Sequence, residues 1–232
     1  MAKILHIETA TQVCSVALSD EGKLPGLKES SEKNSHSATV TVFIDEVMKA
    51  AGMAYGELDA VAVSMGPGSY TGLRIGVSTA KGICFAVDKP LIGISTLQSM
   101  AAGMQAFVTP GIPTLLCPMI DARRMEVYNA LYNTDLGVFR EIRADIIDEG
   151  SFSDELSKFR ILFAGDGAAK CKPVLGHHPN AVFIDDFQVS ATHMIRLAEE
   201  KFSQAEFEDV AYFEPYYLKD FIPGIPKIKG LR

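Results

Sequence analysis

The chain has 232 residues, of which 47% are hydrophobic and 22% charged, and this composition excludes a chain that is disordered throughout. Its 22 Lys and Arg against 29 Asp and Glu give a net charge of -7, which excludes unaided binding of a nucleic-acid backbone. There is no apolar run of the roughly 20 residues that a membrane helix needs, no secretory signal at the start, and no clustered cysteine, so we expect a cytoplasmic protein with reduced thiols.

The first half of the chain predicts three strands followed by alternating helices and strands. Hydrophobic periodicity places the strands at 4–8, 14–19 and 23–29, joined by tight links. A helix capped by Ser35 or Ser37 follows and stops at Gly52. The remaining elements are a buried strand at 60–64, a helix at 71–86, a strand at 91–94 and a helix capped by Ser95 that reaches about residue 106.

A proline and glycine cluster at 109–113 marks the boundary between two predicted domains, 1–108 and 109–232. After it the same order of elements returns: strands at 115–121, 126–132 and 138–144, a short helix at 153–159 that Ser153 caps, a strand at 161–164, a helix at 168–175, a strand at 181–184 and a helix at 192–202. In both halves the first strand ends at an acid, Glu8 or Asp121, and the fourth runs into a glycine turn. The repeat predicts two related α/β lobes, the second carrying the C-terminal tail.

Small residues recur at every fourth position along one face of the predicted helix at 71–86: Gly72, Gly76, Ala80 and Cys84. Each glycine in a helix costs about 1 kcal/mol relative to alanine, so close approach of another element must offset the loss. That element is either the lobe's own sheet or a helix of a second subunit, and we expect contacts with both. We place the partner's closest approach at Gly76, where leucine would block it at little cost to the fold, and expect Val42 of the preceding helix to share this interface.

Several polar groups and glycines are expected at the mouth between the lobes: Glu8, Gly66, Gly68, Ser69, Asp121, Arg123, Arg124 and Asp166. The glycine turn at 66–68 precedes a helix whose free amides could cradle a phosphate. No Gly-Lys-Ser or Gly-Lys-Thr follows it, so a structural turn capped by Ser69 or Thr71 is the favoured interpretation. The three carboxylates could hold magnesium. The arginine pair could meet phosphate or tRNA, although ion pairs with Asp121, Glu126 or a partner's carboxylate are favoured.

The sequence offers no base or nucleophile to accompany these carboxylates, and we predict no catalytic residue. His6 falls inside a strand, His36 beside a helix cap, His177 and His178 in a turn, and His193 on the last helix, so each is predicted to be structural.

The C-terminal tail carries aromatic residues and cations. The aromatic residues are Tyr212, Phe213, Tyr216, Tyr217 and Phe221, and the cations are Lys219, Lys227, Lys229 and Arg232. No arginines interleave the aromatic rings as in a base-stacking platform, so docking onto the second lobe is predicted. The cations are a weak indication of RNA contact.

The duplicated lobes, with an acid closing each first strand, resemble the ribonuclease-H-like fold of sugar kinases, actin and heat-shock chaperone ATPases, which bind ATP between lobes. Four motifs narrow the resemblance: Ile7-Glu8-Thr9-Ala10-Thr11 with Cys14-Ser15-Val16-Ala17-Leu18; Gly66-Pro67-Gly68-Ser69-Tyr70-Thr71-Gly72-Leu73-Arg74-Ile75-Gly76; Asp121-Ala122-Arg123-Arg124-Met125-Glu126-Val127-Tyr128; and Ala164-Gly165-Asp166-Gly167. Together they look like the TsaB (YeaZ) family over almost the whole chain. The family's usual acid at the end of the first strand is aspartate, and Glu8 departs from it.

The resemblance implies a bacterial subunit of the machinery that adds a threonylcarbamoyl group to N6 of adenosine 37 of tRNA (t6A37). In that family the paralogue TsaD carries out the transfer, TsaB dimerises with TsaD as a non-catalytic scaffold, and the ATPase TsaE recycles the complex. We therefore expect tRNA to be contacted only through the complex. Whether the chain forms a homodimer when alone stays open.

The resemblance also bears on cofactors. In the paralogue two histidines four residues apart hold a metal, and the corresponding positions here fall near Thr96 and Met100, so no metal is expected. We expect no tightly bound cofactor, with ATP or ADP left open. The alternative is a stand-alone two-lobed ATP-binding enzyme, such as a small kinase or ATPase, which nucleotide titration and a hydrolysis assay would distinguish.

Overall fold

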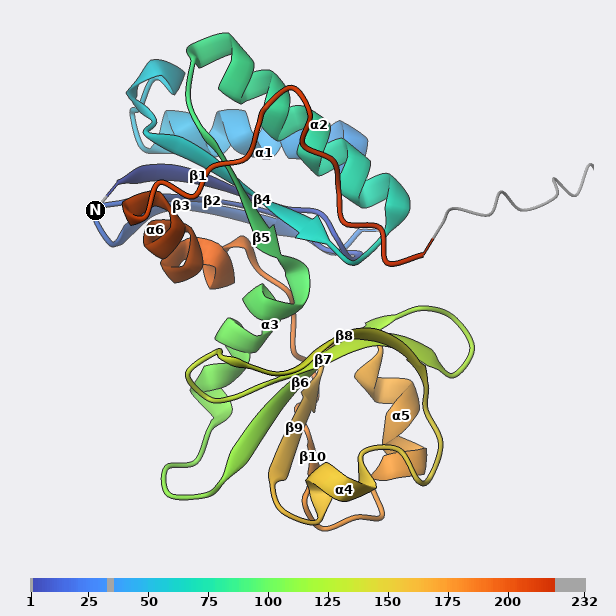
Figure 1. Cartoon of the computed structure of the whole chain (residues 1–232). Coiled ribbons are helices and arrows are strands. Elements are labelled where there is room, and N and C mark those ends of the chain that lie inside the picture. Colours follow the sequence, from blue (N-terminus) through green and yellow to red (C-terminus); the bar gives the residue numbers. More distant parts are fainter. Residues whose placement is uncertain (1, 33–35, 220–232) are drawn as a thin grey trace, which may run out of the picture.

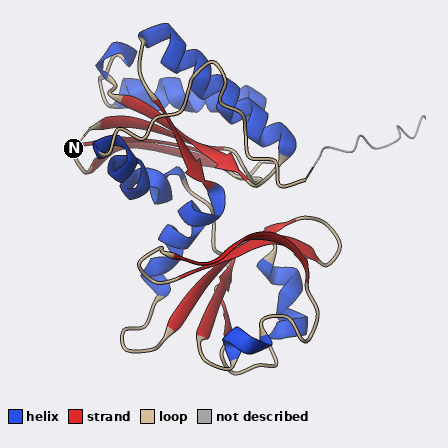
Figure 2. Cartoon of the chain, viewed as in Figure 1, coloured by secondary structure: helices blue, strands red, loops and turns tan. Residues whose placement is uncertain are grey.

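The computed structural model describes residues 2–32 and 36–219, and these residues form two lobes with one five-stranded sheet in each (Figure 1). The first sheet contains β1 (Lys3–Glu8), β2 (Cys14–Asp20), β3 (Lys23–Ser30), β4 (Ala60–Gly66) and β5 (Leu91–Ser95). The second contains β6 (Thr114–Asp121), β7 (Glu126–Tyr132), β8 (Val138–Ile146), β9 (Arg160–Ala164) and β10 (Ala181–Phe183). Figure 2 shows the two sheets and the helices around them.

The two sheets have the same strand order, β3-β2-β1-β4-β5 and β8-β7-β6-β9-β10. In each, the first strand is antiparallel to the second and parallel to the fourth. The predicted fold class, duplicated ribonuclease-H-like lobes with mixed sheets, is confirmed. No helix among the described residues is long and apolar enough to cross a membrane.

Two long helices, α1 (His36–Ala50) and α2 (Tyr70–Val87), cover one face of the first sheet. Their apolar side chains pack with those of β1, β2 and β4 in one buried cluster. Ser69 caps α2 as predicted, because its hydroxyl accepts from the Gly72 amide at 3.2 Å. Of the two predicted caps of α1, Ser35 lies outside the described residues and Ser37 lies within the helix.

In the second lobe the short helix α4 (Ser153–Leu156) and α5 (Ala168–Leu175) cover the corresponding face of the second sheet. Helix α4 is shorter than predicted, and Ser153 is its first residue rather than its cap. The single-turn helices η1 (Tyr55–Glu57) and η2 (Gln105–Phe107) complete the connections.

The last helices of the two halves are shared between the lobes. Helix α3 (Thr96–Met104) packs on β6 and β7 as well as on β4 and β5, whereas η3 (Ala191–Met194) and α6 (Ile195–Ser203) pack on the first sheet. The Ala191 amide donates to the Ser15 hydroxyl at 2.8 Å, and Lys201 Nζ donates to the Gly93 carbonyl at 2.9 Å. One apolar cluster therefore runs from the first sheet through α3 and α6 to the second sheet.

This arrangement corrects the predicted division into 1–108 and 109–232. The second sheet does begin just after the proline and glycine cluster, but the chain from Ser190 onward returns to the first lobe. The physical reason is that α1 and α2 cover only one face of the first sheet, and the apolar side of α6 covers part of the other.

The tail also docks on the first lobe, which corrects the expectation that it lies on the second. The Glu208 amide donates to the Leu91 carbonyl at 2.9 Å, and the Tyr216 amide to the Met65 carbonyl at 2.7 Å. Lys81 Nζ donates to the carbonyls of Ala211 and Phe213. Four residues named in the predictions for the tail lie outside the described residues: Phe221, Lys227, Lys229 and Arg232.

The small-residue face of α2 points into its own lobe. A Cβ on Gly72 would overlap the Thr9 carbonyl oxygen, and a Cβ on Gly76 would overlap Thr9 Oγ1, which donates to the Gly72 carbonyl at 2.8 Å. Ala80 and Cys84 are fully buried. The expectation that Gly72, Gly76, Ala80 and Cys84 form the partner interface is wrong, because the loop after β1 and the lobe's own sheet already occupy that face. Val42, by contrast, is 50% exposed.

This packing predicts opposite effects of alanine at two glycines of α2. Gly76→Ala should lower the free energy of unfolding by about 1–3 kcal/mol, because the new methyl group overlaps Thr9. Gly82→Ala should raise it by about 0.5–1 kcal/mol, because no atom lies near the new Cβ and alanine is the better helix former. Urea unfolding of both variants measures the difference. Equal stability of the two would contradict the packing described here.

Candidate functional site

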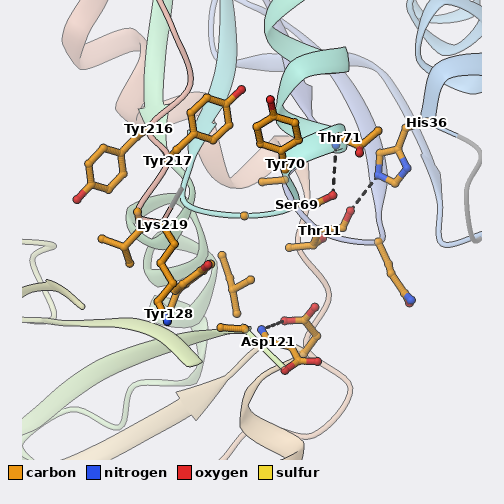
Figure 3. Close-up of a pocket in the computed structure, with 18 of the residues that line it drawn as sticks. Thr11, His36, Ser69, Tyr70, Thr71, Asp121, Tyr128, Tyr216, Tyr217 and Lys219 are labelled. Atoms are coloured by element: carbon orange, nitrogen blue, oxygen red, sulfur yellow. Dashed lines mark hydrogen bonds between the residues drawn. The ribbon is translucent and has the colours of Figure 1, made fainter. Parts of the chain in front are cut away.

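A cleft of about 830 Å³ lies between the lobes (Figure 3). Its lining comes from the loop after β1, the N-terminal ends of α1 and α2, the second lobe and the tail. The lining residues are Ala10, Thr11, Gln12, His36, Ser37, Gly68, Ser69, Tyr70, Thr71, Gly72, Ile75, Ile120, Asp121, Ala122, Arg123, Tyr128, Asp166, Tyr216, Tyr217, Leu218 and Lys219. Gly68, Ser69, Asp121, Arg123 and Asp166 thus lie at the cleft as predicted, whereas Glu8, Gly66 and Arg124 are not among its lining residues.

The first-lobe wall is held by backbone contacts of the loop after β1. The Ser69 amide donates to the Ala10 carbonyl at 2.7 Å, and a Cβ on Gly68 would overlap Ala10. Gly66 has a φ of +113°, a backbone conformation that glycine adopts readily, and its amide donates to Thr96 Oγ1 at 3.1 Å. These contacts favour the structural interpretation of the glycine turn, since each glycine is explained by packing or by its φ angle.

Glu8 lies behind this wall and not in the cleft. Its carboxylate is fully buried and accepts from the Ala10 amide at 2.6 Å. Burial raises the pKa of Glu8 from 4.5 to about 7, although hydrogen bonds from Ala10, Ser64 and Thr9 act in the opposite direction. Glu8 thus orients the loop and does not join the two aspartates at the cleft, so the structure does not bring together the three carboxylates that could have held magnesium. No group of three or more metal-binding side chains occurs among the described residues.

Asp121 and Asp166 do come together at the second-lobe wall. The Asp121 amide donates to Asp166 Oδ1 at 2.9 Å, and the Asp121 carboxylate forms an ion pair with Lys170. Partial burial acts to raise the pKa of Asp121, but Lys170 and the Arg123 amide outweigh it and hold that pKa below its usual value. Burial raises the pKa of Asp166.

Lys170 was missed in the sequence. Its position could have indicated its role. Lys170 lies in the first turn of α5, and α5 follows the glycine turn at 165–167, which lies beside the end of β6.

The two arginines diverge. Arg123 and Arg124 have φ angles of +72° and +52°, so the turn after β6 sends only Arg123 to the cleft. The expected ion pairs of the arginines with Asp121 or Glu126 do not form, since Asp121 pairs with Lys170 and Glu126 with Lys219. The expected pairing with a partner's carboxylate stays a prediction.

Aromatic residues form a part of the cleft that the sequence did not predict. The rings of Tyr70 and Tyr217 lie 5.0 Å apart, and Tyr128 and Tyr216 line the same space (Figure 3). The tail brings Tyr216 and Tyr217 to the cleft. Its aromatic content could have indicated this role, but the sequence analysis expected the tail to dock on the second lobe, whereas it docks on the first.

The histidines have structural partners. His6 is buried within β1, its Nε2 lies 2.8 Å from the Ser19 hydroxyl, and burial lowers the pKa of His6 to about 3. His36 Nε2 donates to the Thr11 carbonyl at 2.9 Å. His193 stacks on Phe187. The cleft therefore combines tyrosine rings with polar side chains, and its aspartates and His36 are already engaged by the protein.

Because Glu8 is buried, we predict that Glu8→Gln stabilises the protein relative to the wild type by an amount that increases with pH. An acid whose pKa is higher in the folded chain keeps its proton longer in the fold, so its contribution to stability falls as pH rises from 4.5 to about 7. The stability of Glu8→Gln relative to the wild type should therefore increase over this range by roughly 3 kcal/mol. Urea unfolding at several pH values measures it. A difference that is constant from pH 4 to pH 8 would show that the carboxyl is not desolvated.

The chain matches known proteins over nearly its full length. The family model described as TsaD, tRNA N6-adenosine threonylcarbamoyltransferase, matches residues 27–220. The chain is 30% identical to tRNA threonylcarbamoyladenosine biosynthesis protein TsaB of Escherichia coli (strain K12), with 94% of this chain and 95% of that protein covered. It is 31% identical to the protein of the same name from Haemophilus influenzae, with 94% and 93% covered.

A solved structure has the same fold. The structure described as YeaZ from Pseudomonas aeruginosa superposes with a TM-score of 0.81 at 23% sequence identity, covering 94% of this chain and all of that one. The shared fold agrees with the near full-length sequence matches. The chain belongs to the TsaB (YeaZ) family of tRNA threonylcarbamoyladenosine biosynthesis proteins.

Proposed function

We propose that this chain is a cytoplasmic, non-catalytic subunit that supports a TsaD-type transferase in forming t6A37 of tRNA. The observation that carries the proposal is the extent of the matches. The TsaB proteins of Escherichia coli and Haemophilus influenzae match over 95% and 93% of their own length, whereas a tRNA N6-adenosine threonylcarbamoyltransferase of Moorella thermoacetica matches at 39% identity over only 22% of its length. The transferase family model also matches most of this chain, but the chain covers only a small part of the Moorella transferase and nearly all of these two TsaB proteins.

The burial of Thr96, Met100 and Glu8 favours a scaffold role for the chain over a catalytic role. Thr96 and Met100, near the positions expected for the transferase's metal-binding histidines, are fully buried, and Thr96 Oγ1 accepts from the Gly66 amide. Glu8 is sequestered behind the cleft wall. Each of these groups is already used in the packing of the protein's interior.

We place the transferase on the outer surface of α1 and α2. Val42 on α1 is 50% exposed and Phe85 on α2 is 85% exposed, so apolar area is available there without disturbing the buried face of α2. In this arrangement the chain needs no tRNA surface of its own, which suits its net charge of -7. A TsaE-type ATPase would act on the assembled pair.

The interlobe cleft keeps a second candidate open, a stand-alone ATP-binding enzyme. The N-terminal end of α2 faces a space of about 830 Å³ and could accept a phosphate.

Reconstitution separates the two candidates. The chain alone should form no t6A from threonylcarbamoyl-adenylate and tRNA, and a TsaD-type transferase with its ATPase should require the chain for full activity. Nucleoside analysis by mass spectrometry measures the product. The isolated chain should also hydrolyse ATP no faster than the variant carrying Asp121→Asn and Asp166→Asn. Robust hydrolysis that this double variant abolishes would favour the enzyme.

Val42→Glu tests the partner surface. A carboxylate in place of an exposed valine at an apolar contact should weaken association with the transferase by about tenfold or more, with unchanged stability of the isolated chain. Ile146→Glu on β8 is the matched control, since Ile146 is 73% exposed and belongs to the second lobe. Titration calorimetry measures both affinities. Equal loss in the two variants would argue against a surface on α1.

A further inference from the structure

The segment at 205–219 is attached to the first lobe along much of its length. Glu208 forms an isolated antiparallel bridge with Leu91 at the outer strand of the sheet. Lys81 of α2 then binds two tail carbonyls, and the Tyr216 amide donates to the Met65 carbonyl at the end of β4. Figure 1 shows this part of the chain running beside β5 and α2 toward the gap between the lobes.

The end of this segment reaches the cleft and then the second lobe. Residues 216–219 line the cleft, and the Tyr217 ring lies 5.0 Å from that of Tyr70. Lys219 Nζ forms an ion pair with Glu126 at the start of β7. Among the described residues, the tail is thus fixed to the first lobe by backbone hydrogen bonds and to the second lobe by the ion pair between Lys219 and Glu126.

These two attachments differ in strength. The Tyr216 amide bonds the carbonyl of a strand residue, whereas the side chains of Lys219 and Glu126 are 48% and 22% exposed. An ion pair in contact with solvent is weak and is screened by salt. The contact with the second lobe is therefore the one that breaks first.

We propose that residues 215–219 act as a strap across the interlobe cleft, with the Lys219–Glu126 ion pair as its releasable latch. With the latch closed, the strap forms one wall of the cleft and holds the lobes at the separation seen here. With the latch open, Tyr217 leaves the wall first, the hydrogen bond from the Tyr216 amide to the Met65 carbonyl then opens more often, and the cleft widens. The strap is a property of the isolated chain and does not depend on the proposed function.

Hydrogen exchange of the full chain, followed by NMR, tests the latch. Lys219→Gln and Glu126→Gln should each speed exchange of the Tyr216 amide by about two- to fivefold, the range expected for loss of an exposed ion pair. Sodium chloride at high concentration should speed it similarly in the wild type and have little effect in Lys219→Gln. The Glu208 amide, bonded to Leu91, should be unaffected.

Lys172→Gln is the matched control, because it removes an exposed ion pair with Asp185 that lies within the second lobe. Unchanged Tyr216 exchange in both latch variants would overturn the proposal, as would an equal effect of Lys172→Gln.

Spin labels test the opening of the cleft. The four native cysteines are buried, so labels can be directed to Ala54→Cys in the first lobe and Asp154→Cys in the second, both exposed positions. Labelled chains are diluted with unlabelled chains to remove distances between molecules. Lys219→Gln should lengthen or broaden the distance distribution. Faster exchange of the Tyr216 amide with an unchanged distribution of distances between the labels would mean that the tail binds the first lobe without holding the two lobes together. That result would reject the strap.

Discussion

The apolar contact that α3, η3 and α6 make between the two sheets is the constraint on which the molecule depends. Each lobe buries one face of its sheet with its own helices, but the remaining faces share a single cluster. The lobes are therefore joined through a shared interior, and the cleft lies between them. A sheet face left uncovered would expose apolar area to water, which is why the chain returns to the first lobe after completing the second.

The close approach of Thr9 to α2 sets the first-lobe wall of the cleft. Glycine at 72 and 76 lowers the helix propensity of α2, yet it allows the loop after β1 to lie directly on the helix, with Thr9 Oγ1 bonded to the Gly72 carbonyl. Glu8 supports the same loop from behind through the Ala10 amide. Some residues of the family's sequence motifs, such as Thr9 and Gly76, thus build the wall, while others, such as Asp121 and Asp166, line the cleft.

Much of the candidate site could be predicted because it follows strand ends. Asp121 ends a strand, and Asp166 and Ser69 follow strands by two and three residues, so the order of elements already placed them at the cleft. Lys170, Tyr217 and Lys219 could not be placed, because their positions depend on which lobe a helix or tail packs against. Periodicity within an element shows which face is apolar and does not show which of two apolar surfaces covers it.

The sequence by itself determined the duplicated order of strands and helices, the glycine turns and the family, since these depend on local periodicity, turn residues and motifs. Only the tertiary structure decided that the small-residue face of α2 is internal, that Glu8 is buried away from the aspartates, and that the end of the chain belongs to the first lobe. The reason is that each outcome depends on which of several surfaces, far apart in the sequence, packs against a given element. The buried area and steric fit that decide this exist only when both surfaces are folded.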